Sequence, residues 1–175
     1  MLVALPRASF SQPHAKVRRI GFLASRSRST PTNPDAYYDS FKQGMRELGY
    51  VEGKNLLIEW RFAEQKFDRL SSLADELVRL SIEVIVTHST AATKALQRAT
   101  NTLPIVSVNM GDPVGSGFVT SLGRPGGNIT GLSGIPADVA PKQMELLRLM
   151  VPALSRAAVL VNPGTGTHPV ILKSI

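Results

Sequence analysis

The chain has 175 residues, no cysteine and a formal net charge of +7. The absence of cysteine excludes a disulfide framework and thiolate chemistry, and no apolar run approaches the ~20 residues of a membrane span. Six basic residues precede the first acidic residue, Asp35, and the remaining 14 basic and 13 acidic residues nearly cancel. The basicity therefore belongs to the amino end, which indicates a solvated tail rather than a nucleic-acid-binding surface.

The first regular elements are a strand and a helix separated by a long loop. VRRIGFLA, residues 17–24, predicts a strand. The polar loop 25–34 that follows is longer than the usual ~2–6 residues, which favours either a loop that closes over a ligand or a plain surface loop. Asp35 is expected to cap the next helix, which Gly49 ends. The helical spacing of four apolar residues predicts their packing in the core: Tyr38, Phe41, Met45 and Leu48.

Two further strand–helix pairs follow. Residues 56–62 predict a second strand, on which Trp60 alternates with Ile58 and is expected to face the core. The leucine stripe of residues 67–80 predicts an amphipathic helix. Residues 82–86, IEVIV, show almost no alternation, which is typical of a central strand covered on both faces. A helix is then expected to open near Ser89 and to run through Ala99.

The stretch 104–133 closes the predicted sheet. The apolar run 104–108 predicts a fourth strand, and the turn residues 109–113 end it. We expect a short helical turn over 117–122 and a strand over 129–132. Strands that alternate with helices in this way predict an α/β fold, a doubly wound and mostly parallel sheet.

A second, incomplete unit is expected at the carboxyl end. Gly134 to Asp138 is the best boundary in the chain. An amphipathic helix over 142–150, a strand over 157–161 and a helix that begins at Pro169 are predicted to follow. This division gives a tail (1–18), a first lobe (19–133), a crossover (134–139) and a fragment of a second lobe (140–175).

Polar residues follow the predicted strands where a parallel sheet places its ligands, at the carboxyl edge. A helix start at this edge binds anions through its N–H groups and dipole, so Ser89, Thr90 and Ala91 are candidates. The alternative is a cap without a ligand, because Ser and Thr begin many helices. Asp112 either holds an ammonium or ring N–H group or only shapes the turn before Pro113. Ser25 in the first loop and Tyr37, which lies off the apolar stripe, complete the candidate set.

His88 is a lone histidine beside a strand end, and no carboxylate lies at a sequence spacing that would indicate a catalytic pair. We interpret it as a surface or hydrogen-bonded residue rather than a catalytic base. No other pattern indicates catalysis, because the first strand is followed by GFLASRSRS and not by a glycine-rich dinucleotide motif. A phosphate loop, a nucleophile elbow and metal-ligand spacing are also missing from the sequence. The sequence therefore predicts neither an enzyme nor a bound cofactor or metal.

The segment GDPVGSGFVTSLGRPGGNITGLS resembles the signature of the ABC-transporter substrate-binding protein family associated with tryptophan and tyrosine uptake. Three more segments are similar to it: IGFLAS, ELGYVEGKNLLIEWRFAE and KQMELLRLMVP with the AAVLVNPGTGTHPVILK that follows. The resemblance implies a periplasmic-binding-protein-like fold of type I. It implies two similar lobes that close on a ligand by hinge motion. It also places the ligand's carboxylate at the turn 87–91.

The resemblance further implies a periplasmic protein that hands an aromatic amino acid or a similar small zwitterion to an ABC permease and ATPase without chemistry. Such a protein needs an export signal, and residues 2–5 are too short for a signal core, so we expect the true start codon upstream of Met1. Because the chain holds only the first helix and strand of the second lobe, we also expect a truncated or frameshifted gene product. Two alternatives stay open: a sensor lobe of a signalling receptor, and a Rossmann-type nucleotide-binding enzyme. A neighbouring permease gene would favour the importer and a neighbouring kinase or cyclase gene the sensor.

Overall fold

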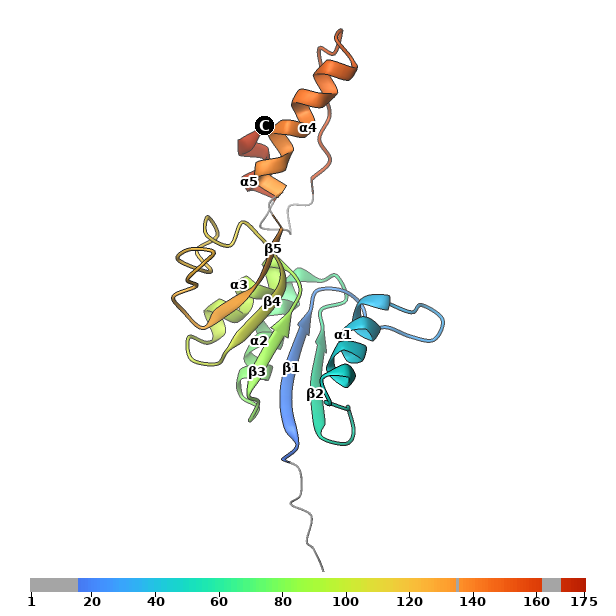
Figure 1. The fold of residues 1–175 in the computed structure, drawn as a ribbon, viewed down its shortest axis with the longest axis vertical. Coiled ribbons are helices and arrows are strands. Elements are labelled where there is room, and N and C mark those ends of the chain that lie inside the picture. The colour runs from blue at the N-terminus through green and yellow to red at the C-terminus, as the bar shows by residue number, and fades with distance from the viewer. Residues whose placement is uncertain (1–15, 135, 162–167) are drawn as a thin grey trace, which may run out of the picture.

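The computed structural model describes residues 16–134, 136–161 and 168–175, and it shows one sheet of five parallel strands in the order β2-β1-β3-β4-β5 (Figure 1). The strands are β1 (Arg18–Ala24), β2 (Leu56–Phe62), β3 (Val84–Thr87), β4 (Ile105–Gly111) and β5 (Ile129–Gly134). The helices are α1 (Ala36–Glu47), α2 (Leu70–Val78) with a 3₁₀ turn η1 (Phe67–Arg69) before it, α3 (Thr90–Ala99), α4 (Pro136–Met150) and α5 (His168–Ser174). This order is that of a doubly wound α/β sheet, so the predicted fold class is confirmed.

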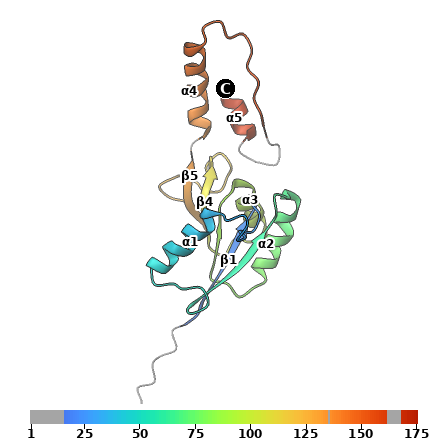
Figure 2. The same cartoon turned by 90° about the vertical axis from the view of Figure 1, so that its right-hand side faces the viewer.

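Helices cover both faces of the sheet, α1 on one and α2 with α3 on the other (Figure 2). Successive residues of β1 supply the two cores: Phe22 packs on the α1 side and Leu23 on the α2–α3 side, and both are buried. A strand buried on both faces needs no polar alternation, which explains the continuous apolar run GFLA. Trp60 packs on the α1 side beside Phe22, as its alternation predicted.

The predicted ends of α1 are confirmed. The Asp35 side chain accepts a hydrogen bond from the backbone N–H of Tyr37 at 3.1 Å. Gly49 adopts a φ of 85°, the left-handed conformation that ends helices and that glycine adopts without a Cβ clash. The apolar stripe is correct for Tyr38 and wrong for Leu48, whose side chain is 75% exposed. Leu48 lies at the C-cap, where the chain has already left the helical spiral.

The α1 side of the sheet is open over its last two strands. Leu132 of β5 is 69% exposed, and Thr130 is exposed as well. Val106 and Val108 of β4 are only partly buried, whereas Ile105 and Ile129, which face α2 and α3, are buried. Among the described residues, no helix covers this part of the sheet.

Three predicted elements differ from the structure. The helical turn expected over 117–122 lies earlier, where Ser116 N–H donates to the Asp112 carbonyl and Phe118 N–H to the Pro113 carbonyl. It ends at Gly117, whose φ of 70° is incompatible with a continuing helix. Residues 157–161 form no strand, because a strand needs a hydrogen-bonded neighbour and all described strands belong to the one sheet. The helix expected over 142–150 begins earlier, at Pro136.

Candidate functional site

The carboxyl ends of β1, β3 and β4 lie side by side because the three strands are parallel and adjacent. Leu23 pairs with Thr87, and Thr87 pairs with Ser107. Residues 25–36, 87–91 and 110–115, which follow these strands, therefore share one edge of the sheet, here called the rim. The predicted convergence of the three segments is confirmed.

Direct contacts join the three segments of the rim. The Thr90 hydroxyl accepts a hydrogen bond from the backbone N–H of Gly111 at 3.0 Å, which ties the start of α3 to the end of β4. The rings of Tyr37 and His88 lie 5.3 Å apart, which brings the first loop and α1 against the start of α3. The rim is therefore a continuous surface and not three separate loops.

The start of α3 has the form that the sequence predicted. The Ser89 hydroxyl accepts a hydrogen bond from Ala92 N–H at 3.2 Å and caps the helix. A helix start carries N–H groups that the helix itself does not pair, and the helix dipole adds positive potential there, which makes Ala91 N–H a candidate donor to a ligand. The capping role of Ser89 is established by this geometry. A role of Ser89, Thr90 and Ala91 in holding a carboxylate stays a prediction.

Buried hydroxyls fix this helix start from below. The Thr93 and Ser107 hydroxyls lie 2.9 Å apart, and Thr93 also donates to the Ser89 carbonyl at 2.8 Å. The Thr87 hydroxyl donates to the Leu23 carbonyl at 2.9 Å. Thr87, Thr93 and Ser107 are fully buried, where unpaired hydroxyls would be costly. These bonds fix the start of α3 against β4 and the end of β3 against β1.

Tyr37, the residue that follows the first segment of the rim, belongs to a group of charged and aromatic side chains there. Arg26 forms an ion pair with Asp35 at 3.0 Å, and its guanidinium lies 5.9 Å from the centre of the Tyr37 ring. Tyr37 is 36% exposed, so its ring is available to a ligand, as predicted from its place off the apolar stripe. Arg26 was not predicted, although it is one of two arginines in a loop otherwise made of Ser, Thr, Pro and Asn.

His88 is neither exposed nor hydrogen-bonded through Nδ1, contrary to the interpretation from sequence. It is 8% exposed, packs among the rings of Phe22, Tyr37 and Tyr38, and its Nδ1 has no hydrogen-bond partner among the described residues. Burial is the main cause that lowers the pKa of His88 from 6.5 to about 4; the nearby Arg26 charge acts in the same direction, and the Asp35 charge opposes it. The imidazole is therefore neutral at pH 7.

Asp112 shapes its own turn. It adopts a left-handed φ of 40°, which aspartate tolerates better than most residues, and its Oδ1 accepts a hydrogen bond from Gly115 N–H at 2.8 Å. A Cβ at Gly115 would overlap the Asp112 carboxylate, so a larger residue there would force this side chain to move. Asp112 therefore shapes its turn, which is one of the two roles that the sequence left open. Its role in binding an ammonium group stays a prediction.

Ser25 lies at the rim but is largely enclosed, with 9% of its surface exposed. Its carbonyl accepts a hydrogen bond from Gln65 N–H at 2.8 Å. Glu64 and Gln65 have φ values of 53° and 60°, so the turn after β2 is held in a strained conformation at the same edge. Contact between Ser25 and a ligand stays a prediction.

The rim offers binding groups of both charges and no arrangement for covalent chemistry that we can identify. Positive potential comes from Arg26 and the start of α3, negative charge from Asp35 and Asp112, and an aromatic face from Tyr37. The described part of the chain contains no group of three side chains suited to a metal ion. This composition suits a small ligand that carries both a positive and a negative charge.

Residues 31–173 match the family model described as ABC transporter substrate binding protein. The chain belongs to this family. Members of the family are typically extracytoplasmic and bind small molecules for ABC transporters. None of the described helices combines the length and the apolar composition that a bilayer crossing requires.

Relatives of this substrate-binding family agree in fold and differ in length from the present chain. A curated relative, the tyrosine-binding protein of Clostridioides difficile (strain R20291), is 30% identical over 122 residues, which cover 70% of this chain and 35% of the relative. A conserved domain protein from Vibrio cholerae O1 biovar El Tor superposes with a TM-score of 0.75 at 28% identity, covering 90% of this chain and 52% of that one. The ABC domain from Streptococcus pneumoniae, solved in complex with L-Trp, gives a TM-score of 0.74 at 27% identity and covers 89% and 51%. The chain thus spans about a third to a half of the length of these relatives.

Proposed function

We propose that this chain supplies the first ligand-binding lobe of the solute-binding component of an ABC importer, and that the ligand is an aromatic amino acid. The observation that carries the proposal is the composition of the rim. The start of α3 and Arg26 can bind a carboxylate, and Asp112 can bind an ammonium group. Tyr37 presents an aromatic face next to them. The names of the relatives, one for tyrosine and one for a complex with L-Trp, support an aromatic side chain on the ligand.

The same proposal includes a domain division, a location and partners. Residues 19–133 form the first lobe, 134–139 the crossover and 140–175 the beginning of a second lobe. The protein acts in the periplasm, performs no chemistry and delivers its ligand to a permease and an ATPase. Co-purification of this chain with the products of neighbouring permease and ATPase genes tests these partners.

Replacement of Tyr37 tests the ligand site. A ring-to-ring contact contributes about 0.5–1.5 kcal/mol beyond burial, so Tyr37→Ala should weaken L-tryptophan binding about fivefold. Calorimetric titration of the 175-residue chain with L-tryptophan measures this change. Tyr50→Ala is the matched control, because Tyr50 is exposed to the same extent (37%) and follows the C-terminal end of α1.

Ligand specificity gives a second test of amino-acid binding at the rim, with outcomes that would contradict it. L-tryptophan should bind more tightly than indole-3-propionate, which lacks the ammonium group, and than tryptamine, which lacks the carboxylate. Equal affinity for all three compounds, or an equal effect of Tyr37→Ala and Tyr50→Ala, would show that the rim does not hold an amino acid.

A further inference from the structure

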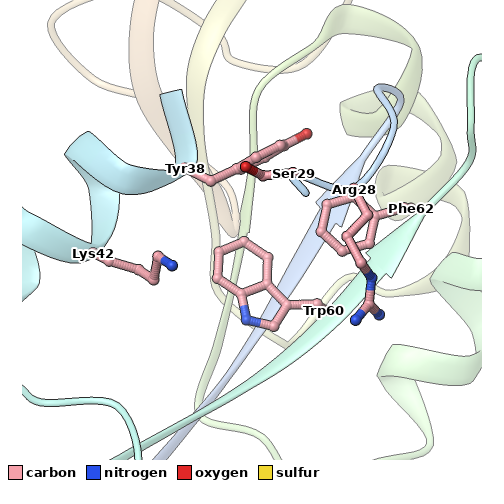
Figure 3. A pocket seen from close by; sticks show the side chains of 6 residues that line it. All are labelled: Arg28, Ser29, Tyr38, Lys42, Trp60 and Phe62. Carbon is pink, nitrogen blue, oxygen red and sulfur yellow. The ribbon is translucent and has the colours of Figure 1, made fainter. Parts of the chain in front are cut away.

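A pocket of about 140 Å³ lies beside the candidate ligand residues, between the first loop, α1 and the edge strand β2 (Figure 3). It is lined by Arg28, Ser29, Tyr38, Lys42, Trp60 and Phe62. None of the candidate ligand residues of the rim lines it. We call this site the ring pocket.

Three aromatic rings shape the ring pocket. The rings of Trp60 and Phe62, two residues apart on β2, are stacked with their centres 5.8 Å apart and their planes at 10°, and this pair is called the floor of the pocket. Tyr38 stands almost perpendicular to this floor, at 80° to Trp60 and 88° to Phe62. A flat ring placed in the corner meets the faces of two rings and the wall formed by the third, which are favoured aromatic geometries. The volume is close to the ~150 Å³ of an apolar cavity that takes up benzene.

Two cations flank the rings, on opposite sides of the pocket in Figure 3. The Arg28 guanidinium lies 5.2 Å from the centre of the Phe62 ring and makes no ion pair with any described residue. Lys42 pairs with Asp39 at 3.4 Å, but the Asp39 side chain is 59% exposed, so this pair is weak and readily exchanged. Glu64 accepts from the backbone N–H of Arg28 at 3.4 Å and not from its guanidinium.

The absence of an acidic residue from the lining sets the charge of the ligand. Arg28 and Lys42 attract a carboxylate and repel an ammonium group. A zwitterionic amino acid is therefore attracted through its carboxylate but repelled through its ammonium group. The preferred compound carries one flat ring and one negative charge. This preference differs from that of the rim, which offers groups of both charges.

We propose that the ring pocket is a second binding site, separate from the candidate ligand residues of the rim, for a single-ring aromatic carboxylate. The ligand ring lies on Trp60 and Phe62, and its carboxylate meets Arg28, with Lys42 as the second cation. This proposal does not depend on the proposed importer function, because it uses none of the residues on which that function rests.

Trp60 is the one tryptophan of the 175-residue sequence, so its fluorescence reports directly on this pocket. Titration with benzoate should change the Trp60 emission saturably, with a dissociation constant on the order of 1 mM for so small a ligand. Cyclohexanecarboxylate keeps the charge without the flat ring, and benzylamine keeps the ring with the opposite charge. Both should bind at least about fivefold more weakly than benzoate.

Charge-neutralising variants identify the cations. Arg28→Gln should weaken benzoate binding about tenfold, because a charged hydrogen bond is lost, and Lys42→Gln about threefold, because Asp39 competes for Lys42. Arg98→Gln is the matched control: Arg98 is exposed on α3, on the other face of the sheet, and its variant should bind benzoate as the unchanged chain does.

The outcomes separate this proposal from the function proposed for the rim. Tyr37→Ala should leave the benzoate response unchanged, and Arg28→Gln should leave L-tryptophan affinity unchanged in calorimetry. The ring pocket proposal is wrong if benzoate gives no saturable change, if benzylamine binds as well as benzoate, or if Tyr37→Ala abolishes the response. None of these results bears on amino-acid binding at the rim.

Discussion

Gly131→Ala is expected to lower the free energy of unfolding by at least about 3 kcal/mol, within the range of severe single substitutions. Gly131 has a φ of 147°, which side-chain-bearing residues rarely adopt, and a Cβ there would overlap the backbone carbonyl of Ser107 on the neighbouring strand β4. Backbone cannot move aside as a flexible side chain can, so β5 would have to separate from β4. Urea unfolding, followed by circular dichroism, measures the change.

Gly127→Ala provides the control for that substitution. Gly127 precedes β5, has no positive φ, and a Cβ there would meet no atom within 4 Å. Its replacement should change stability by less than about 1 kcal/mol. Similar unfolding midpoints for the two variants would mean that β5 does not approach β4 as closely as the register of Ser107 with Gly131 indicates.

Acid is expected to destabilise the chain through His88 by up to about 3 kcal/mol. The pKa of His88 falls from 6.5 to about 4 on folding, chiefly because the ring is buried. The unfolded chain therefore binds a proton below pH 6.5 that the folded chain does not accept until about pH 4. The contribution of a neutral His88 is complete above pH 6.5 and is lost as the pH falls towards 4, at about 1.36 kcal/mol for each pKa unit.

His88→Gln isolates this effect from the protonation of carboxylates, which also destabilises proteins in acid. The unfolding free energy of the unchanged chain should fall more steeply between pH 6.5 and 4 than that of His88→Gln, and the two curves should run parallel above pH 7. A second control is His168→Gln, because His168 begins α5, which lies outside the sheet and its two cores. Parallel curves for the unchanged chain and His88→Gln over the whole range would contradict a neutral, buried histidine.

The sequence was sufficient to predict the sheet and its carboxyl edge. Continuous apolar runs such as GFLA, and cap residues such as Asp35 and Ser89, are local signals, and the structure confirms them. The strand expected over 157–161 was wrong because a strand depends on a neighbour that the described part of the chain does not offer. Leu48 was misplaced because periodicity does not show where a helix ends.

The interior of the candidate site was harder to predict. His88 is buried because Phe22, Tyr37 and Tyr38, from two other elements, surround it, and no pattern near His88 records that contact. The ion pair of Arg26 with Asp35 joins the beginning of a loop to its end, and its partners could not be assigned from spacing. The ring pocket likewise arises where the first loop and α1 pack beside Trp60 and Phe62 of β2.

Buried hydroxyls brace two junctions at the ends of the strands: Thr93 bonds Ser107 between α3 and β4, and Thr87 bonds the Leu23 carbonyl between β3 and β1. Movement of α3 relative to β4 would break the Thr93–Ser107 hydrogen bond, which water does not reach because both side chains are fully buried. A solute that arrives at Ser89 therefore meets donors that already point in their final directions. Under the proposed function, the groups that bind a carboxylate are positioned during folding, whereas the exposed Tyr37 and Arg26 adjust when the ligand binds.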